Sequence, residues 1–144
     1  LKVSVAKLRI GLVLAASGGV VSALKWPAKL GLIAALGNGK QGQSWIHHSD
    51  LVRMFFEAAQ QKWEGVYNAV SPHPVEQKEF MRQLAHAYGS IMWLPPMPTF
   101  LVRIPMGAMS TLMFNSHWIS ASKALDKGFM FDFPELKEAL RNLI

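Results

Sequence analysis

The chain has 144 residues, of which 51% are hydrophobic and 17% are charged, where about 25% charged is usual. This length and apolar content permit a buried core and exclude an intrinsically disordered segment, and the absence of cysteine excludes a disulfide scaffold. Residues 1–49 hold six basic residues and no acidic ones, and they account for the whole net charge of +6. The six are dispersed among apolar residues, which favours a small anionic ligand or an acidic partner surface over nucleic acid.

The first third predicts a strand, a helix and a glycine-rich loop. Lys2–Leu14 is rich in Val, Leu and Ile, which indicates a strand covered on both faces within a parallel sheet. Val20–Leu32 is typical of a helix broken near Pro27, and a glycine-rich loop follows over Leu36–Ser44. A strand that is covered on both faces lies inside a sheet. Both edges of the predicted strand Lys2–Leu14 therefore need neighbouring strands, either from later in the chain or from residues absent from this sequence.

The middle of the chain continues the alternation of strands and helices. Trp45–His47 is predicted to be extended, and Ser49 is expected to cap a helix over Asp50–Lys62. Val66–Val70 predicts a further strand. Strand, helix and strand in this order predict an α/β fold.

The last part is predicted to be mostly helical. Helices are expected over Pro74–Tyr88, Pro98–Phe114, Ser120–Lys127 and Pro134–Leu143, and extended pieces over Ile91–Leu94 and Phe129–Phe133. Three prolines interrupt the longest uncharged run, 84–102, so we expect no membrane span and a soluble, cytoplasmic protein. The chain begins at Leu1 without an initiator methionine or a signal-peptide pattern, and we therefore expect residues to be missing upstream.

Several local patterns imitate functional motifs. The segment 37–42, GNGKQG, matches G-x-G-x-x-G, but a dinucleotide site needs the last glycine to open a helix, and an extended segment is predicted there instead. Gln41 stands where a Walker A motif requires Ser or Thr. His47 and His48 are adjacent on a predicted strand and point to opposite faces, so no metal site is expected. No nucleophile with a base can be assembled, and no catalytic residue is assigned.

Two cations are candidates for an anion contact. Arg9 lies within an apolar strand, where an unpaired guanidinium is costly, so it must meet a carboxylate, a backbone carbonyl or an anionic ligand. A structural ion pair or a position at the end of the strand explains Arg9 equally well. Lys40, in the glycine-rich loop of the acid-free third, is the second candidate.

The order of four segments resembles a known family. These segments are LRIGLVL (8–14), GNGKQGQSWIHHSDLV (37–52), VYNAVSPHPV (66–75) and KGFMFDFPELKEAL (127–140). Together they resemble the C-terminal half of an epimerase-like atypical short-chain dehydrogenase/reductase, from the NAD(P)-dependent sugar-nucleotide epimerase family whose members are sometimes labelled cell-division inhibitors. The resemblance extends from about Lys2 to the end of the chain.

The resemblance implies an α/β fold that comprises the C-terminal part of a Rossmann-like parallel sheet and a small, mostly helical cap on the substrate side. Residues 1–74 would belong to the Rossmann-like domain and residues 75–144 to the cap. The family's glycine-rich pyrophosphate turn and its Tyr-x-x-x-Lys pair are absent from this sequence. NADP or NAD would serve the full-length family, and none is expected to bind tightly to this chain.

The resemblance also implies positions for site residues. Arg9 falls on a strand arginine close to the cofactor, and Lys40, Gln41 and Trp45 fall in the segment that borders the substrate. Extended relatives commonly carry an arginine where this chain has Gln43, and a guanidinium there would bind a diphosphate through two hydrogen bonds. The Met and aromatic side chains after residue 90 are expected to fill a core or line an apolar pocket.

Two functions remain open. In the first, the chain is the substrate-side fragment of an oxidoreductase or epimerase that acts on a sugar-nucleotide-like or other small molecule, and it is inactive without its N-terminal half. In the second, it is a non-catalytic binding or assembly module that self-associates through an exposed sheet edge.

Overall fold

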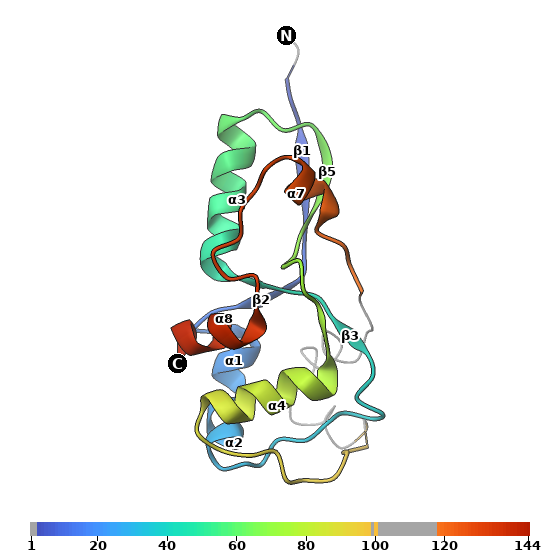
Figure 1. The fold of residues 1–144 in the computed structure, drawn as a ribbon, viewed down its shortest axis with the longest axis vertical. Coiled ribbons are helices and arrows are strands. Elements are labelled where there is room, and N and C mark those ends of the chain that lie inside the picture. The colour runs from blue at the N-terminus through green and yellow to red at the C-terminus, as the bar shows by residue number, and fades with distance from the viewer. Residues whose placement is uncertain (1–2, 99, 101–117) are drawn as a thin grey trace.

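The computed structural model describes residues 3–98, residue 100 and residues 118–144 (Figure 1). In chain order the elements are β1 (Ala6–Ile10), β2 (Leu12–Leu14), α1 (Gly19–Ala23), α2 (Lys25–Lys29), β3 (Gly42–Gln43), β4 (Trp45–His47), α3 (His48–Gln60), β5 (Gly65–Ala69), β6 (Val75–Glu76), α4 (Gln77–Ala87), α7 (Ser122–Asp126) and α8 (Leu136–Leu143). Strands and helices alternate through most of this order. The predicted α/β class is therefore confirmed.

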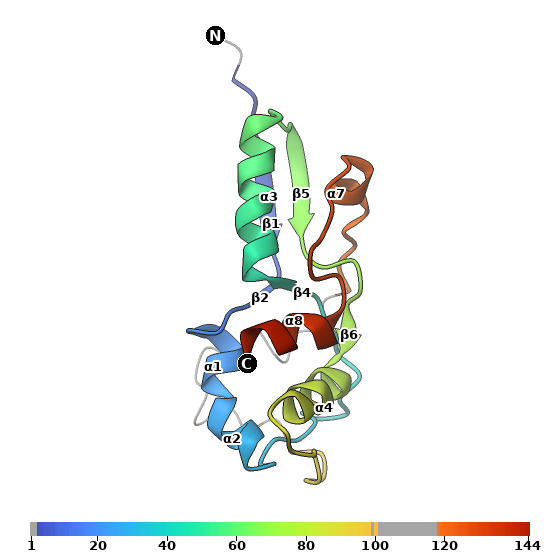
Figure 2. The ribbon, with the colours of Figure 1, turned by 60° about the vertical axis from the view of Figure 1, so that its left-hand side comes forward.

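The strands pair in three short ladders. β1 runs parallel to β5, from Ala6 opposite Gly65 to Ile10 opposite Ala69. β2 runs parallel to β4, and β3 pairs antiparallel with β6. Parallel strands need long crossover connections, and α3 lies between β4 and β5 in the chain and beside β1 and β5 in space (Figure 2). This arrangement confirms the predicted parallel sheet and the strand at 45–47, and the strand expected at 66–70 is observed at Gly65–Ala69.

The expected single strand over Lys2–Leu14 is instead two strands broken at Gly11. The Gly11 N–H donates to the Ala69 carbonyl at 3.2 Å, whereas the Leu12 N–H donates to the Ser44 carbonyl at 2.9 Å. The chain therefore leaves β5 and joins β4 within one residue. A Cβ atom at position 11 would lie 2.6 Å from the Ser44 oxygen and 2.7 Å from Val70 Cγ1, so only glycine fits this crossing.

The expectation that the first strand is covered on both faces is wrong for the described chain. Ala6 and Leu8 pack on the buried cluster that includes Met54 of α3, but Lys7 and Arg9 on the opposite face are exposed. Alternate residues of a strand point to opposite faces, and α3 covers one face only. Within the described residues, β5 is also the one strand that pairs with β1. Coverage of the second face cannot be read from the apolar composition of a strand.

Four other expectations need correction. The helix expected over 20–32 is two short helices separated at Leu24, and Pro27 lies in the first turn of α2, where its missing N–H costs nothing. Ser49 is not the cap of α3, because this helix begins at His48, two residues before the expected start at Asp50. Its cap is His47, whose Nδ1 accepts the Ser49 N–H at 3.2 Å. Residues 91–94 and 129–133 form no strand. The helix expected over 98–114 lies almost entirely outside the described residues.

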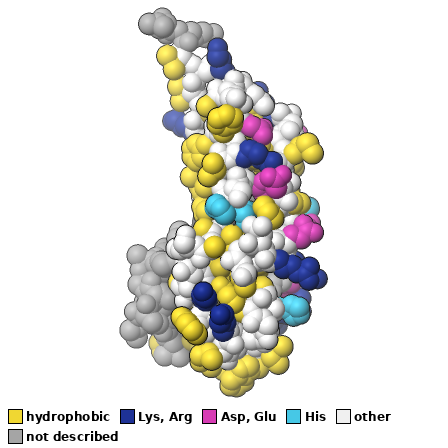
Figure 3. Space-filling view, turned by 90° about the vertical axis from the view of Figure 1, so that its left-hand side faces the viewer, with side chains coloured by type: hydrophobic (Ala, Val, Ile, Leu, Met, Phe, Trp, Pro, Cys, Tyr) yellow, Lys and Arg dark blue, Asp and Glu magenta, His cyan; other side chains and the backbone are white. Residues whose placement is uncertain are grey.

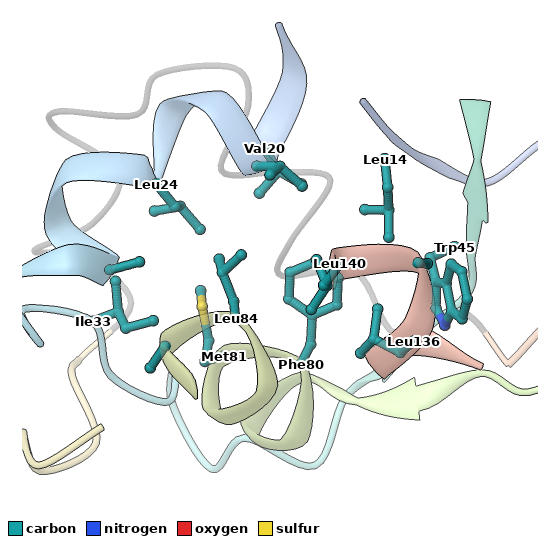
Figure 4. Close-up of a cluster of buried hydrophobic side chains, with 14 of the residues drawn as sticks. Leu14, Val20, Leu24, Ile33, Trp45, Phe80, Met81, Leu84, Leu136 and Leu140 are labelled. Atoms are coloured by element: carbon teal, nitrogen blue, oxygen red, sulfur yellow. The ribbon is translucent and has the colours of Figure 1, made fainter. Parts of the chain in front are cut away.

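Two buried clusters hold the structure together. The first brings side chains of β2, α1, α4 and α8 into contact, as Figure 4 shows for Leu14, Val20, Phe80, Leu84 and Leu140. The second joins α3, β5 and α7 and includes Trp63, Tyr67 and Phe129, each at most 2% exposed. Each cluster contains residues from both sides of position 74. The domain boundary at 74/75 stays a prediction.

Asp50 attaches the segment before α8 to the start of α3. Its side chain is fully buried, and its two carboxylate oxygens accept the backbone N–H groups of Asp132 and Phe133 at 2.9 and 3.0 Å. Arg53 Nη2 lies 3.0 Å from the same carboxylate, and Arg53 Nη1 lies 2.8 Å from Asp132. The N–H groups of 132 and 133 are thus satisfied by a side chain, which explains why this segment needs no neighbouring strand.

We predict that Asp50→Ala lowers the free energy of unfolding by about 3 kcal/mol, because two buried N–H groups and a guanidinium lose their acceptor. The measurement is urea unfolding followed by tryptophan fluorescence. Asp126→Ala, at an exposed position in α7, is the matched control and should change stability by less than about 0.5 kcal/mol. Equal effects of the two substitutions would contradict this role of Asp50.

Candidate functional site

A pocket of about 400 Å³ opens where β1 gives way to β2. Its lining comes from the β1–β2 break, the start of α1, the residues around β3 and one residue near the C-terminal segment. The lining residues are Ile10, Gly11, Leu12, Val13, Gly19, Val20, Gly42, Gln43, Ser44 and Ile119. It lies at the carboxyl end of β1, the edge of a parallel sheet at which α/β proteins bind their ligands.

Two glycines allow the walls of this pocket to approach each other. Gly11 fits between the Ser44 carbonyl and Val70, as described above. A Cβ atom at Gly42 would lie 2.5–2.6 Å from the indole ring of Trp118, so this ring rests directly on the backbone of β3. Trp118 is 57% exposed and therefore forms a partly open aromatic wall next to the pocket.

The polar side chains of the lining are held in place. Gln43 and Ser44 are 3% and 4% exposed, and Ser44 Oγ accepts the Ile119 N–H at 2.9 Å. This bond fixes the segment after residue 117 against β3. The described lining contains no Lys, Arg, His, Asp or Glu, so this part of the wall is uncharged and mainly apolar.

Arg9 precedes the pocket residue Ile10 and lies on the opposite face of β1, because neighbouring strand residues alternate. The expected burial of Arg9 is wrong: the side chain is exposed and has no ion pair among residues 3–98, 100 and 118–144. The cost of an unpaired guanidinium in an apolar interior therefore does not arise here.

The structure places the other three predicted residues around the pocket without making them part of its lining. Lys40 is exposed, and its N–H donates to Asn38 Oδ1 at 3.0 Å. Gln41 Nε2 donates to the Leu36 carbonyl at 3.0 Å. Trp45 is fully buried, so its indole can influence a ligand only by positioning its neighbour Ser44. The roles of these three residues stay predictions.

The glycine-rich segment 37–42 does not have the geometry of a dinucleotide site. Gly42 begins β3 and is followed by β4, so the last glycine opens no helix. The Gly39 and Gln41 carbonyls instead accept the N–H groups of Lys78 and Gln77 at the start of α4. Among the described residues, no group of three or more His, Cys, Asp or Glu side chains is placed to hold a metal ion. No helix in the same part of the chain is long and apolar enough to cross a bilayer.

Sequence reasoning missed a polar cluster around His47. Its ring lies 4.0 Å from the Phe133 ring and 4.6 Å from the His48 ring, measured between centroids. Burial lowers the pKa of His47 from its ordinary value of 6.5, and the charge of His48 lowers it further, while Asp50, Asp132 and the Asn142 side chain oppose the shift. Only the spacing of Asp50 and Arg53, three residues apart at a helix start, signalled part of this cluster.

Comparisons with known proteins extend this picture. Residues 97–143 match a family model described as a domain of unknown function, DUF1731. One relative is the Arabidopsis thaliana protein called epimerase family protein SDR39U1 homolog, chloroplastic. The two sequences are 33% identical over 143 residues, and the match covers 99% of this chain and 41% of the relative. The crystal structure of human epimerase family protein SDR39U1 with NADPH matches with a TM-score of 0.87 at 28% identity, over 96% of this chain and 47% of that one.

These matches confirm the expected resemblance to epimerase family proteins. The chain corresponds to the C-terminal part of the family's members and spans less than half the length of the two relatives above. The Thermus thermophilus UDP-glucose 4-epimerase structure, a complex with NAD, matches with a TM-score of 0.66 at 20% identity and supports the fold alone. The structure of the human protein contains NADPH, which confirms the predicted NAD(P) cofactor for full-length members.

The described residues of this chain do not fit the pyrophosphate of NAD(P). Its one G-x-G-x-x-G match leads into strands, and α1, which begins beside the pocket, is only five residues long. The exposed side chains of Arg9 and Lys40 are the predicted groups whose charge suits an anion.

We predict that the chain loses stability as the pH falls below 6.5. The folded state lowers the pKa of His47, so the unfolded chain binds the proton first, and stability is complete above 6.5 and declines toward the folded pKa. His47→Asn keeps an acceptor for the Ser49 N–H but cannot titrate, and it should flatten this dependence in urea unfolding between neutral and mildly acidic pH. His86→Asn, at an exposed position of α4, should retain the slope. An unaltered slope in His47→Asn would exclude this residue as the cause.

Proposed function

We propose that this chain is the substrate-side part of an NAD(P)-dependent oxidoreductase or epimerase that acts on a small molecule. The observation that carries the proposal is the pocket at the carboxyl end of β1, within a fold that matches an NADPH-bound epimerase-family structure over 96% of the chain. The cofactor would supply hydride transfer, and this chain would bind and orient the substrate. Residues 1–74 would complete the Rossmann-like domain, and residues 75–144 would form the cap.

The four predicted site residues have distinct parts in this proposal. Arg9 faces the side of β1 that α3 leaves uncovered, where its charge would meet a phosphate of the cofactor. Lys40 and Gln41 would border the entrance to the substrate pocket next to Gly42. Trp45 Nε1 donates to the His73 carbonyl at 3.1 Å, and this bond would hold Ser44 in the pocket wall.

We expect the chain alone to be catalytically inactive. Proton transfer to a substrate carbonyl or alcohol requires a placed acid or base, and the described pocket lining contains no titratable side chain. The sequence also has no Tyr-x-x-x-Lys pair. The acid or base and the Tyr-x-x-x-Lys pair would come from an N-terminal part with which this chain would assemble.

A hybrid protein tests the proposal directly. The N-terminal part of the human epimerase family protein would be fused before this chain, and NADPH binding would be measured by calorimetry. We predict that the hybrid binds NADPH with micromolar affinity and that the chain alone does not bind it. The Arg9→Gln hybrid should bind NADPH roughly tenfold more weakly, because a charge-assisted hydrogen bond is worth about 1.5–3 kcal/mol. Lys7→Gln, two residues away on the same exposed face, is the control. Tight NADPH binding by the 144-residue chain alone would contradict the proposal.

A second candidate is a non-catalytic module that assembles with a copy of itself. β1 has one paired edge among the described residues, and Val3, Val5 and Ile10 around it are 75%, 58% and 48% exposed. The outer face of α3 adds the exposed side chains of Phe55 and Phe56, and Figure 3 shows apolar side chains over this part of the surface. Exposed strand edges with apolar neighbours pair with other chains.

For this candidate we predict dimers or larger species of the 16.0 kDa chain at micromolar concentration, measured by light scattering. Val5→Lys should shift the equilibrium toward monomer, since a charged edge opposes pairing of strands. Asn38→Lys, in an exposed loop, adds the same charge away from β1 and serves as the control. A monodisperse monomer would remove self-association from consideration and leave the first proposal intact.

A further inference from the structure

We infer that the pocket at the β1–β2 break binds an uncharged, mainly apolar molecule, such as a small ketone or the matching alcohol, and not a nucleotide sugar. The inference rests on the proposed function, because it specifies the substrate class for the same pocket. It is carried by the chemistry of the walls, their rigidity and the position of the nearest charges.

The described walls offer no compensation for a charged ligand. Eight of the ten lining residues are Gly, Ile, Leu or Val, and the other two, Gln43 and Ser44, are neutral. An anion transferred from water to such surroundings loses its hydration without gaining a counter-charge, which costs far more than the transfer of a neutral polar group. These described walls therefore disfavour a diphosphate and suit a molecule with an apolar body.

The nearest cations do not reach into the pocket. Arg9 alternates with Ile10 and so leaves β1 on the opposite face. The Lys40 side chain is exposed, and the residue precedes β3 by two positions. The five basic residues of the described range 3–49 are all exposed, and none of them is among the described lining residues. On β1, the proposed cofactor-binding charge of Arg9 and the apolar pocket residue Ile10 therefore lie on opposite faces.

The walls also have little freedom to adapt to a larger ligand. Gly11 and Gly42 are each packed so closely that a methyl group would collide with Ser44 or Trp118. Ser44 in turn holds Ile119 through its hydroxyl. A volume of about 400 Å³ is near the small end of the usual range of roughly 300–1,000 Å³ for ligand pockets. The cavity therefore suits a compact molecule.

Fluorine NMR of the fluorotryptophan-labelled chain tests this inference without any cofactor. Trp118 rests on Gly42 of the lining, and its resonance would be assigned by Trp118→Phe. The probes are tetralone, a neutral bicyclic ketone, and UDP. We expect tetralone to shift the Trp118 resonance in a saturable manner and UDP to leave it unchanged at the same concentrations.

A matched pair of variants locates the effect. Ile10→Asp introduces a carboxylate at a half-exposed lining position and should weaken tetralone binding at least about tenfold, because apolar contact is replaced by a charge that must stay hydrated. Val5→Asp makes the same change at an exposed position outside the lining and should alter the affinity less than about twofold. Dispersed fluorine resonances in both variants verify that they fold.

Three results would overturn the inference: a Trp118 shift with UDP, no shift with tetralone, or tetralone binding that Ile10→Asp leaves unchanged. The outcome is separable from that of the proposed function. A hybrid that fails to bind NADPH while the chain still binds tetralone would remove the oxidoreductase proposal and leave the ligand class standing.

Discussion

The close approach of Gly11 to the Ser44 carbonyl determines how this chain is organised. At this point the strand leaves β5 and joins β4, which is possible only because no side chain stands between the two backbones. The crossing divides one apolar run into β1 and β2 and opens a cavity at the carboxyl end of β1. A single glycine thus connects the sheet topology with the candidate binding site.

A second constraint keeps the C-terminal segment in place around this site. Asp50 binds the backbone of 132 and 133, and Ser44 binds that of 119, so side chains of the central region hold both ends of the described stretch 119–133. These contacts join residues about 75 to 83 positions apart in the chain. The two buried clusters share this property, since each combines residues from early and late elements. The site therefore depends on long-range contacts across the whole described chain.

The sequence was sufficient for features that depend on local chemistry. The strands at 45–47 and 66–70, the α/β class and the end of α4 near Gly89 follow from β-branched runs and from glycine at a positive φ of 75°. Features that depend on contacts between residues far apart in the chain could not be predicted from the sequence. The burial of Arg9 was predicted from its apolar neighbours in the chain, but exposure depends on whether another element covers that face.

The pocket itself illustrates the same limit. Ile10, Gly11 and Ser44 belong to none of the site motifs considered, and Gly42 ends only the rejected G-x-G-x-x-G match. Their neighbours Arg9, Lys40 and Gln41 were predicted as site residues instead. In residues 129–133 aromatic side chains alternate with other residues, as in a strand. The segment nevertheless pairs with no strand, because Asp50 accepts the N–H groups of Asp132 and Phe133. His47 and Phe133 come together only through this attachment. Resemblance of segment order identified the family, while the contacts that form the site required the structure.

Amide hydrogen exchange of β1 tests the central claim that this chain presents a half-completed sheet to its N-terminal part. The measurement compares Ala6–Ile10 in the isolated chain, diluted to a monomer, with the same residues in the hybrid. The account predicts that the β1 amides not bonded to β5 exchange rapidly in the isolated chain and become strongly protected in the hybrid. Rapid exchange of these amides in both proteins would contradict it.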